Sequence, residues 1–176
     1  MSVLIIFATV EGQSRKIADF AANIARGAGL SVSLLDTSNT PEDISFDGVD
    51  EVILAAPVHE RRHPAGFELF LSTQKEELAK RRTCMLSVSL SAAFPAGMEE
   101  AEDYLVEMKM RTGLTPDVEM LVAGAVHSLS YDYYESQVLR HIVLRDRDFD
   151  SRKGDREFTD WDALRTALTD FLGGPA

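Results

Sequence analysis

Residues 3–14 read VLIIFATVEGQS, and this stretch decides the fold that the sequence predicts. Residues 3–8 are apolar without alternation, which is typical of a parallel strand covered on both faces. From Ser14 to about Arg26, apolar side chains recur at helical spacing, and Gly27 follows them. A buried strand, a short loop and an amphipathic helix predict the opening unit of an α/β fold.

The same alternation continues toward the end of the chain. Further apolar runs predict strands at residues 32–35, 51–56, 84–90 and 118–126. Helical spacing predicts three more helices, one beginning at Pro64 and two at residues 98–113 and 161–172. Five strands separated by helices imply a parallel sheet with right-handed crossovers. Since no repeat or linker interrupts the pattern, we expect a single domain over residues 1–176, with Trp161 packed against the sheet.

The composition excludes several classes of protein. Hydrophobic residues make up 45% and charged residues 27% of the chain, which indicates a soluble globular protein. The net charge of -11 and the pI of about 4.8 oppose binding to nucleic acid. No apolar run approaches the ~18 residues that span a bilayer. The N-terminus carries no basic leader, so a cytoplasmic location is expected. The single cysteine, Cys84, lies in an apolar run and is expected in the core.

Residues 127–158 interrupt the alternation of strands and helices. This connection of about thirty residues is far longer than usual, and loops of such length are either functional or disordered. We favour a function. Its basic stretch, residues 140–156, could meet anionic groups of a substrate or an anionic membrane surface, which leaves a peripheral membrane contact open. Aspartates interleave with the arginines, however, so a solvated and internally paired loop is the favoured interpretation.

The loop at residues 9–14 carries the strongest functional signal, because ligands of open parallel sheets bind beyond the carboxyl ends of the strands. Gly12 permits a tight turn, and Thr9 and Ser14 offer hydroxyl groups. The amides of Gly12, Gln13 and Ser14 would lie at the positive end of the following helix, which suits a phosphate. Alternatively, Ser14 is only a helix N-cap and Gly12 only a turn residue. The loop alone leaves both interpretations open.

Other recognisable sites are not predicted. The chain has neither G-x-x-x-x-G-K-[ST] nor G-x-G-x-x-G. A phospho-receiver domain would need acidic residues after the first and third strands, where Thr9 and Pro57 stand. His59 and His63 are four residues apart, but Pro57 and Pro64 bracket them and no third ligand is in view. A metal site is therefore not expected.

The motif at residues 9–14, followed by Lys16-Ile17-Ala18, resembles the first loop of flavodoxin-fold proteins. It is more specifically similar to the bacterial menaquinone-dependent protoporphyrinogen IX dehydrogenase family, which has an acidic residue and G-Q-[ST] at these places. Further stretches that look like motifs of that family are SVSL at 87–90, VAGAV at 122–126 with Tyr131 and Tyr134 beyond it, and RK at 152–153 leading to FTDW at 158–161. The similarity covers the whole chain, and the TDW signature makes it more specific than a general flavodoxin match.

The resemblance implies a three-layer α/β fold of the flavodoxin-like kind. Its five-stranded parallel sheet would have the order 2-1-3-4-5, with a long insertion between strand 5 and the last helix. It also implies a flavin mononucleotide (FMN) held by three loops. The residues that would hold the phosphate are Thr9, Glu11, Gly12, Gln13 and Ser14. The residues that would flank the isoalloxazine ring are Pro57, Val58, His59, Ser89, Leu90 and Ser91, with His59, His63 or Tyr131 as its stacking partner.

The second of these loops departs from the family. The family carries an aromatic residue and a glycine near the flavin, where this chain has Glu60 and Arg61. A positive charge near the pyrimidine edge of the ring would favour the anionic reduced flavin. Arg61 or Arg62 is therefore a candidate for tuning the reduction potential.

The resemblance implies an oxidoreductase that oxidises protoporphyrinogen IX and passes the electrons through the flavin to a quinone. No residue is assigned as catalytic. A flavodoxin-type electron carrier is the second interpretation, because strong acidity suits docking to basic partners, although the long insertion argues against it. A flavodoxin-fold module that has lost the flavin is the third, suggested by the altered second loop. The oligomeric state is left open, and a homodimer is compatible with all three.

Overall fold

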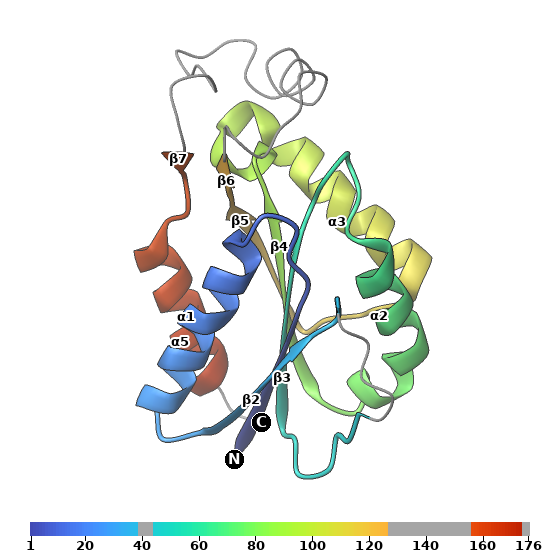
Figure 1. The fold of residues 1–176 in the computed structure, drawn as a ribbon, viewed down its shortest axis with the longest axis vertical. Helices are drawn as coiled ribbons and strands as arrows, with labels where there is room; N and C mark the ends of the chain where they lie inside the picture. The colour runs from blue at the N-terminus through green and yellow to red at the C-terminus, as the bar shows by residue number, and fades with distance from the viewer. Residues whose placement is uncertain (39–43, 127–155, 174–176) are drawn as a thin grey trace.

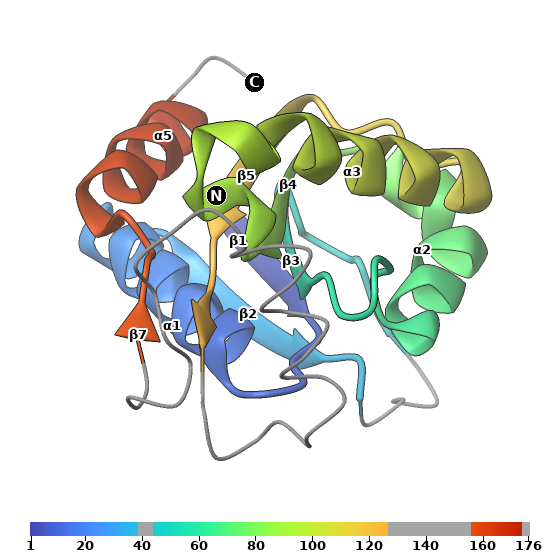
Figure 2. The same cartoon turned by 90° about the horizontal axis from the view of Figure 1, so that it is seen from above.

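Apolar runs without alternation place five strands at the centre of the molecule, where helices cover both faces of the sheet (Figures 1 and 2). The computed structural model describes residues 1–38, 44–126 and 156–173. The strands of the main sheet are β1 (Ser2–Phe7), β2 (Ser31–Asp36), β3 (Glu51–Pro57), β4 (Arg82–Ser89) and β5 (Val118–Ala123). The helices are α1 (Gln13–Gly27), α2 (Ala65–Leu78), α3 (Met98–Thr112) and α5 (Trp161–Gly173). Two short strands, β6 (Ala125–Val126) and β7 (Arg156–Glu157), form a separate antiparallel pair.

The main sheet is parallel throughout and has the order β2-β1-β3-β4-β5, which confirms the predicted topology. Helices α1 and α5 cover one face and α2 and α3 cover the other, so the molecule has three layers (Figure 2). The strand order reverses between β1 and β3, which are neighbours in the sheet. Because all strands run the same way, the loops that follow β1, β3 and β4 emerge at one edge, at the top of Figure 1.

Each face of the sheet has its own apolar core, and β1 contributes to both. On one face Ile5 packs with Ile17 of α1 and Leu168 of α5, and each of these three side chains is fully buried. On the other face Ile6 belongs to a cluster with Leu71 of α2. Successive residues of a strand point to opposite faces, so a strand between two helical layers needs apolar side chains at every position. This explains the unbroken apolar run at residues 3–8.

The fifth predicted strand is wrong in its extent, because residues 118–126 do not form one strand. Strand β5 ends at Ala123, and Gly124 leads the chain out of the main sheet. The N–H of Gly124 donates to the carbonyl of Ser89 at 3.0 Å, and its carbonyl accepts from the N–H of Phe158 at 3.0 Å. The next two residues pair with β7 instead. Ala125 and Val126 are as apolar as the residues of β5, but they pair with β7 and not with β4.

The predictions made for the long connection fall mostly outside the described residues. Residues 39–43, 127–155 and 174–176 are not described, so the predicted role of Tyr131 and that of nearly all of the basic stretch stay predictions. The described part of this connection begins at β7, which lies beside β6 at the upper edge of the molecule (Figure 1). None of the helices in the described ranges is both long and apolar enough to cross a membrane.

Candidate functional site

The first loop, residues 9–14, ends at a helix start whose first amide groups have no acceptor within the helix. Helix α1 begins at Gln13, and its first helical hydrogen bond runs from the N–H of Lys16 to the carbonyl of Gly12 at 3.1 Å. The amides of Gln13, Ser14 and Arg15 therefore precede the helical ladder and lie at the positive end of the helix dipole. The hydroxyl of Thr9 accepts a hydrogen bond from the N–H of Gly12 at 2.9 Å and so closes the loop.

Position 12 requires glycine because of its backbone conformation, and not because a side chain would lack room. Its φ is 96°, in the left-handed region that side chains rarely adopt. A Cβ built at this position would meet no atom within 4 Å, so the volume above Gly12 is open. The loop is thus a glycine turn at a helix start, which is an arrangement that binds phosphate in other α/β folds.

Ser14 is not the N-cap that the alternative interpretation requires. Gly12 occupies the cap position, and no side chain caps the helix. Ser14 is only 1% exposed, and among the described residues its hydroxyl has no hydrogen-bond partner. A buried hydroxyl without a partner costs about 1–3 kcal/mol. The structure therefore contains an unused donor at the open end of α1, where a phosphate oxygen would satisfy it.

The side chain of Gln13 is directed at the segment that precedes α5. Its amide nitrogen donates to the hydroxyl of Thr159 at 2.9 Å, and that hydroxyl donates to the carbonyl of Ala123 at 2.6 Å. Only the backbone amide of Gln13 is therefore left for a phosphate. Two stretches that carried the resemblance, GQS and TDW, touch each other directly in the folded protein.

A second set of contacts ties the same two segments together. The Nζ of Lys16 lies 2.5 Å from a carboxylate oxygen of Glu157, and the indole N–H of Trp161 donates to the other oxygen at 2.5 Å. The Trp161 ring packs against Phe20 of α1, with ring centroids 4.8 Å apart, and against the apolar cluster on this face of the sheet. The TDW signature thus anchors the start of α5 on α1, and through Gln13 it contacts the first turn of α1 at the end of the first loop.

The second loop, residues 57–63, turns back through two residues in an unusual backbone conformation. His59 and Arg62 pair through both backbone hydrogen bonds, at 2.9 and 3.1 Å. Between them, Glu60 and Arg61 have φ of 49° and 66°. Tight turns with two positive φ values are normally made by Asn-Gly or similar pairs, because a side chain there costs ~1–2 kcal/mol. This strained turn stands where the sequence departs from the family.

Two ion pairs hold the strained turn in place. The Nη1 of Arg61 lies 2.9 Å from Oε1 of Glu100 on α3, and the Nη2 of Arg62 lies 2.9 Å from Oε2 of Glu68 on α2. Glu68 also binds Arg111, at 2.7 Å. Burial alone would raise the pKa of Glu68, but hydrogen bonds from Arg111 and Arg62 outweigh it and lower that pKa. Both arginines proposed for tuning the flavin are thus directed at carboxylates of the protein.

His63, the last residue of the second loop, is buried and neutral. It is 1% exposed, and its Nε2 is 2.9 Å from the hydroxyl of Ser87 on β4. Burial lowers the pKa of His63 to about 4. Among the described residues, no three histidine, cysteine or carboxylate side chains are grouped closely enough to hold a metal ion.

The third loop, residues 89–97, is closed by its own contacts. The hydroxyl of Ser89 accepts from the N–H of Ala92 at 3.2 Å, and the hydroxyl of Ser91 donates to Glu100 at 3.2 Å. A Cβ at Gly97 would lie 2.3 Å from the carbonyl oxygen of Ser91, so only glycine permits this approach. Ser89 and Ser91, which the resemblance assigned to the flavin ring, lie at the carboxyl end of β4 beside the second loop.

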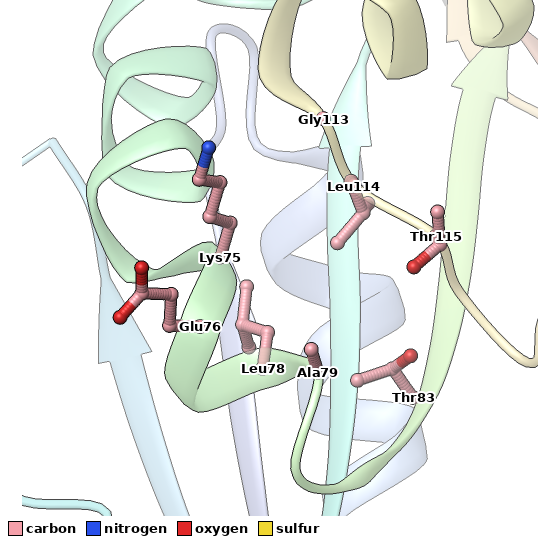
Figure 3. Close-up of a pocket in the computed structure, with 8 residues that line it drawn as sticks. All are labelled: Lys75, Glu76, Leu78, Ala79, Thr83, Gly113, Leu114 and Thr115. Atoms are coloured by element: carbon pink, nitrogen blue, oxygen red, sulfur yellow. The ribbon is translucent and has the colours of Figure 1, made fainter.

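A pocket of about 230 Å³ lies elsewhere, near the amino ends of β4 and β5. It is formed by the end of α2 and by the turn after α3, with Leu78, Thr83 and Leu114 among its walls (Figure 3). Because ligands of this fold bind at the opposite edge, we do not connect this pocket with the three loops.

The structure adds residues that sequence reasoning missed. Glu68 and Glu100 lie on α2 and α3, outside the predicted loops, yet each binds an arginine of the second loop. In the sequence Glu100 occurs in a run of acidic helical residues, where a solvated side chain is the ordinary expectation, and Glu68 stands alone between Phe67 and Leu69. Only the fact that Glu68 is buried, which needs the fold, identifies it.

Comparison with known proteins agrees with this geometry. Residues 4–152 match the family described as "Flavodoxin domain". The protoporphyrinogen IX dehydrogenase [quinone] of Escherichia coli (strain K12) is 24% identical over 166 residues, which cover 93% of this chain and 91% of that protein. The oxidised flavodoxin 1 of Bacillus cereus is 17% identical, covers 100% of both chains and superposes with a TM-score of 0.61. A Fusobacterium nucleatum flavodoxin bound to flavin mononucleotide is 11% identical, covers 98% of this chain and 95% of that one, and has a TM-score of 0.52.

Proposed function

Since the chain belongs to the flavodoxin domain family, we propose that it is an FMN-dependent oxidoreductase that oxidises a porphyrinogen and delivers the electrons to a quinone. The reaction class follows the Escherichia coli relative, whose name states both the substrate and the acceptor. The similarity to that protein extends over almost the full length of both chains, so it is not confined to a cofactor loop.

The observation that carries the proposal is the buried hydroxyl of Ser14, which has no hydrogen-bond partner in the described part of the chain. It lies in the first turn of α1, immediately after the left-handed Gly12 and among amides that have no helical acceptor. A phosphate monoester would accept hydrogen bonds from this hydroxyl and from the amides of Gln13 and Ser14. The helix dipole favours its negative charge, so binding needs no lysine in a chain of net charge -11.

The flavin ring would then lie between the second and third loops, at the carboxyl ends of β3 and β4. The proposed ring contacts are Pro57, Val58 and His59 on one side and Ser89, Leu90 and Ser91 on the other. Thr9 and Glu11 would complete the phosphate end. Bound flavin supplies the two-electron chemistry, and the protein binds and orients it and limits access of water. Tyr131 as a stacking partner stays a prediction.

An electron carrier is the second candidate function. The strong negative charge of the chain favours docking to basic redox proteins, and the fold is shared with flavodoxins. The long connection between β5 and α5 favours the enzyme, because a carrier has little need of about thirty extra residues near the flavin.

Flavin titration of the purified full chain tests the shared premise. We expect FMN to bind and its fluorescence to be quenched in the complex. Riboflavin should bind more weakly because it lacks the phosphate. Equal affinity for FMN and riboflavin would contradict the phosphate site, and no binding of either would refute both redox functions. Quinone-dependent oxidation of protoporphyrinogen IX by the FMN-loaded protein then separates the enzyme from the carrier.

A further inference from the structure

Glu100 connects the two loops that face each other across the proposed ring site. It lies in the first turn of α3, where a negative charge is favoured by the helix dipole. Its Oε1 accepts from Arg61 of the second loop at 2.9 Å, and its Oε2 accepts from the hydroxyl of Ser91 of the third loop at 3.2 Å. One carboxylate therefore uses each of its oxygens for a different loop.

Tyr104 lies one helical turn further along α3. It is buried, and Glu100 and Ser91 are among the polar groups that shift the pKa of its hydroxyl. Burial first, and then the Glu100 carboxylate, raise the pKa of Tyr104 to about 12. The guanidinium of Arg61 lies over the Tyr104 ring, 5.6 Å from its centroid. Arg61 thus contacts both Glu100 and Tyr104, while Glu100 contacts both loops.

The two loops differ in how much they need this support. The third loop is already rigid, because Gly97 packs directly against the backbone of Ser91. The second loop carries strain at Glu60 and Arg61, and strained backbone persists only where its surroundings hold it. The contact from Arg61 to Glu100 therefore links the strained turn to the rigid loop.

We propose that Glu100 is a positioning residue that sets the separation of the second and third loops and thereby the affinity for the flavin ring. The inference rests on the proposed flavin site. It goes beyond it, because Glu100 needs no contact with the flavin and acts through Arg61 and Ser91. Its effect is confined to the ring end of the ligand, since the phosphate loop is built by α1 on the other face of the sheet.

The ratio of FMN to riboflavin affinity tests the assignment. Glu100→Gln keeps the size of the side chain and removes its charge. We expect Kd to rise about fivefold for both ligands, so that the ratio of the two Kd values is unchanged. Glu99→Gln is the matched control, because Glu99 is exposed in the same helical turn and its change removes the same charge. It should leave both Kd values as in the wild type.

Arg61→Gln provides a second route to the same contact. A double-mutant cycle compares the two single variants with the variant that carries both Glu100→Gln and Arg61→Gln. If Glu100 acts through Arg61, the double variant should bind both ligands no more weakly than the single variant with the lower affinity. Wild-type affinity in Glu100→Gln would overturn the inference and leave the flavin site standing, and so would a loss for FMN alone. A wild-type protein that binds no flavin would instead overturn the proposed function, and the inference with it.

Discussion

The first and second loops leave the same edge of the sheet but are built in different ways. The first loop is made by backbone: a left-handed glycine and a helix start, followed by the buried hydroxyl of Ser14, for which no described residue is a hydrogen-bond partner. The second loop is made by side chains: Glu60 and Arg61 hold left-handed conformations, and Glu68 and Glu100 on neighbouring helices restrain the turn. The turn of the first loop is set by residues that are close together in the sequence, Thr9 and Gly12. The second keeps its shape only as long as distant charges hold it.

Lowering the pH should have the largest effect on stability, and it should act through His63, the buried last residue of the second loop. Its pKa is about 4 in the folded protein and 6.5 as the ordinary value, so between these pH values the unfolded chain binds more protons. Stability therefore rises with pH across this window and falls by about 3 kcal/mol from pH 6.5 to pH 4. Urea unfolding at a series of pH values measures it. The difference between wild type and His63→Gln isolates this residue, and parallel curves would contradict the assignment.

Removal of Glu68 should be the next largest effect. Glu68→Ala leaves Arg62 and Arg111 without their shared carboxylate, and we expect a loss of about 2 kcal/mol, reduced because both arginines are partly exposed. Glu76→Ala, an exposed glutamate of the same helix, should change the free energy of unfolding by less than ~0.5 kcal/mol. Equal losses in the two variants would mean that the second loop does not depend on this cluster.

Ser14→Ala should separate binding from stability at the first loop. Removal of a buried hydroxyl without a partner should leave the stability of the free protein unchanged or raise it by up to ~1 kcal/mol. The affinity for FMN should fall about tenfold and that for riboflavin should not change. Thermal unfolding and fluorescence titration measure the two effects. A destabilised free protein would show that the hydroxyl has a partner in the fold.

Glu60→Asn should have the smallest effect and the opposite sign. Asparagine tolerates the left-handed conformation better than glutamate, so the variant should gain about 0.5 kcal/mol, or ~1–2 °C in the midpoint of thermal unfolding. Glu60→Ala relieves no backbone strain and is the control. If both variants gain equally, the benefit lies in the lost charge and not in the turn.

Local patterns in the sequence predicted the fold, and the structure confirms it. The run at residues 3–8 predicted a strand buried on both faces, and Gly12 indicated the turn into α1. Strand order was also predicted correctly, through the family resemblance. The extent of the fifth strand was not, because Ala125 and Val126 are as apolar as the residues before them. What changed at Gly124 was the pairing partner, β7, which lies about thirty residues away along the chain.

By itself, the sequence determined the buried strand, the glycine turn and the helix start that suit a phosphate, since each depends on residues within a few positions of one another. Only the tertiary structure decided that the hydroxyl of Ser14 is buried with no partner among the residues that are described, that Gln13 binds Thr159, and that Glu68 and Glu100 hold the second loop. These facts join segments up to 146 positions apart. Such contacts depend on how the helices pack on the sheet, and no short stretch of sequence encodes that packing.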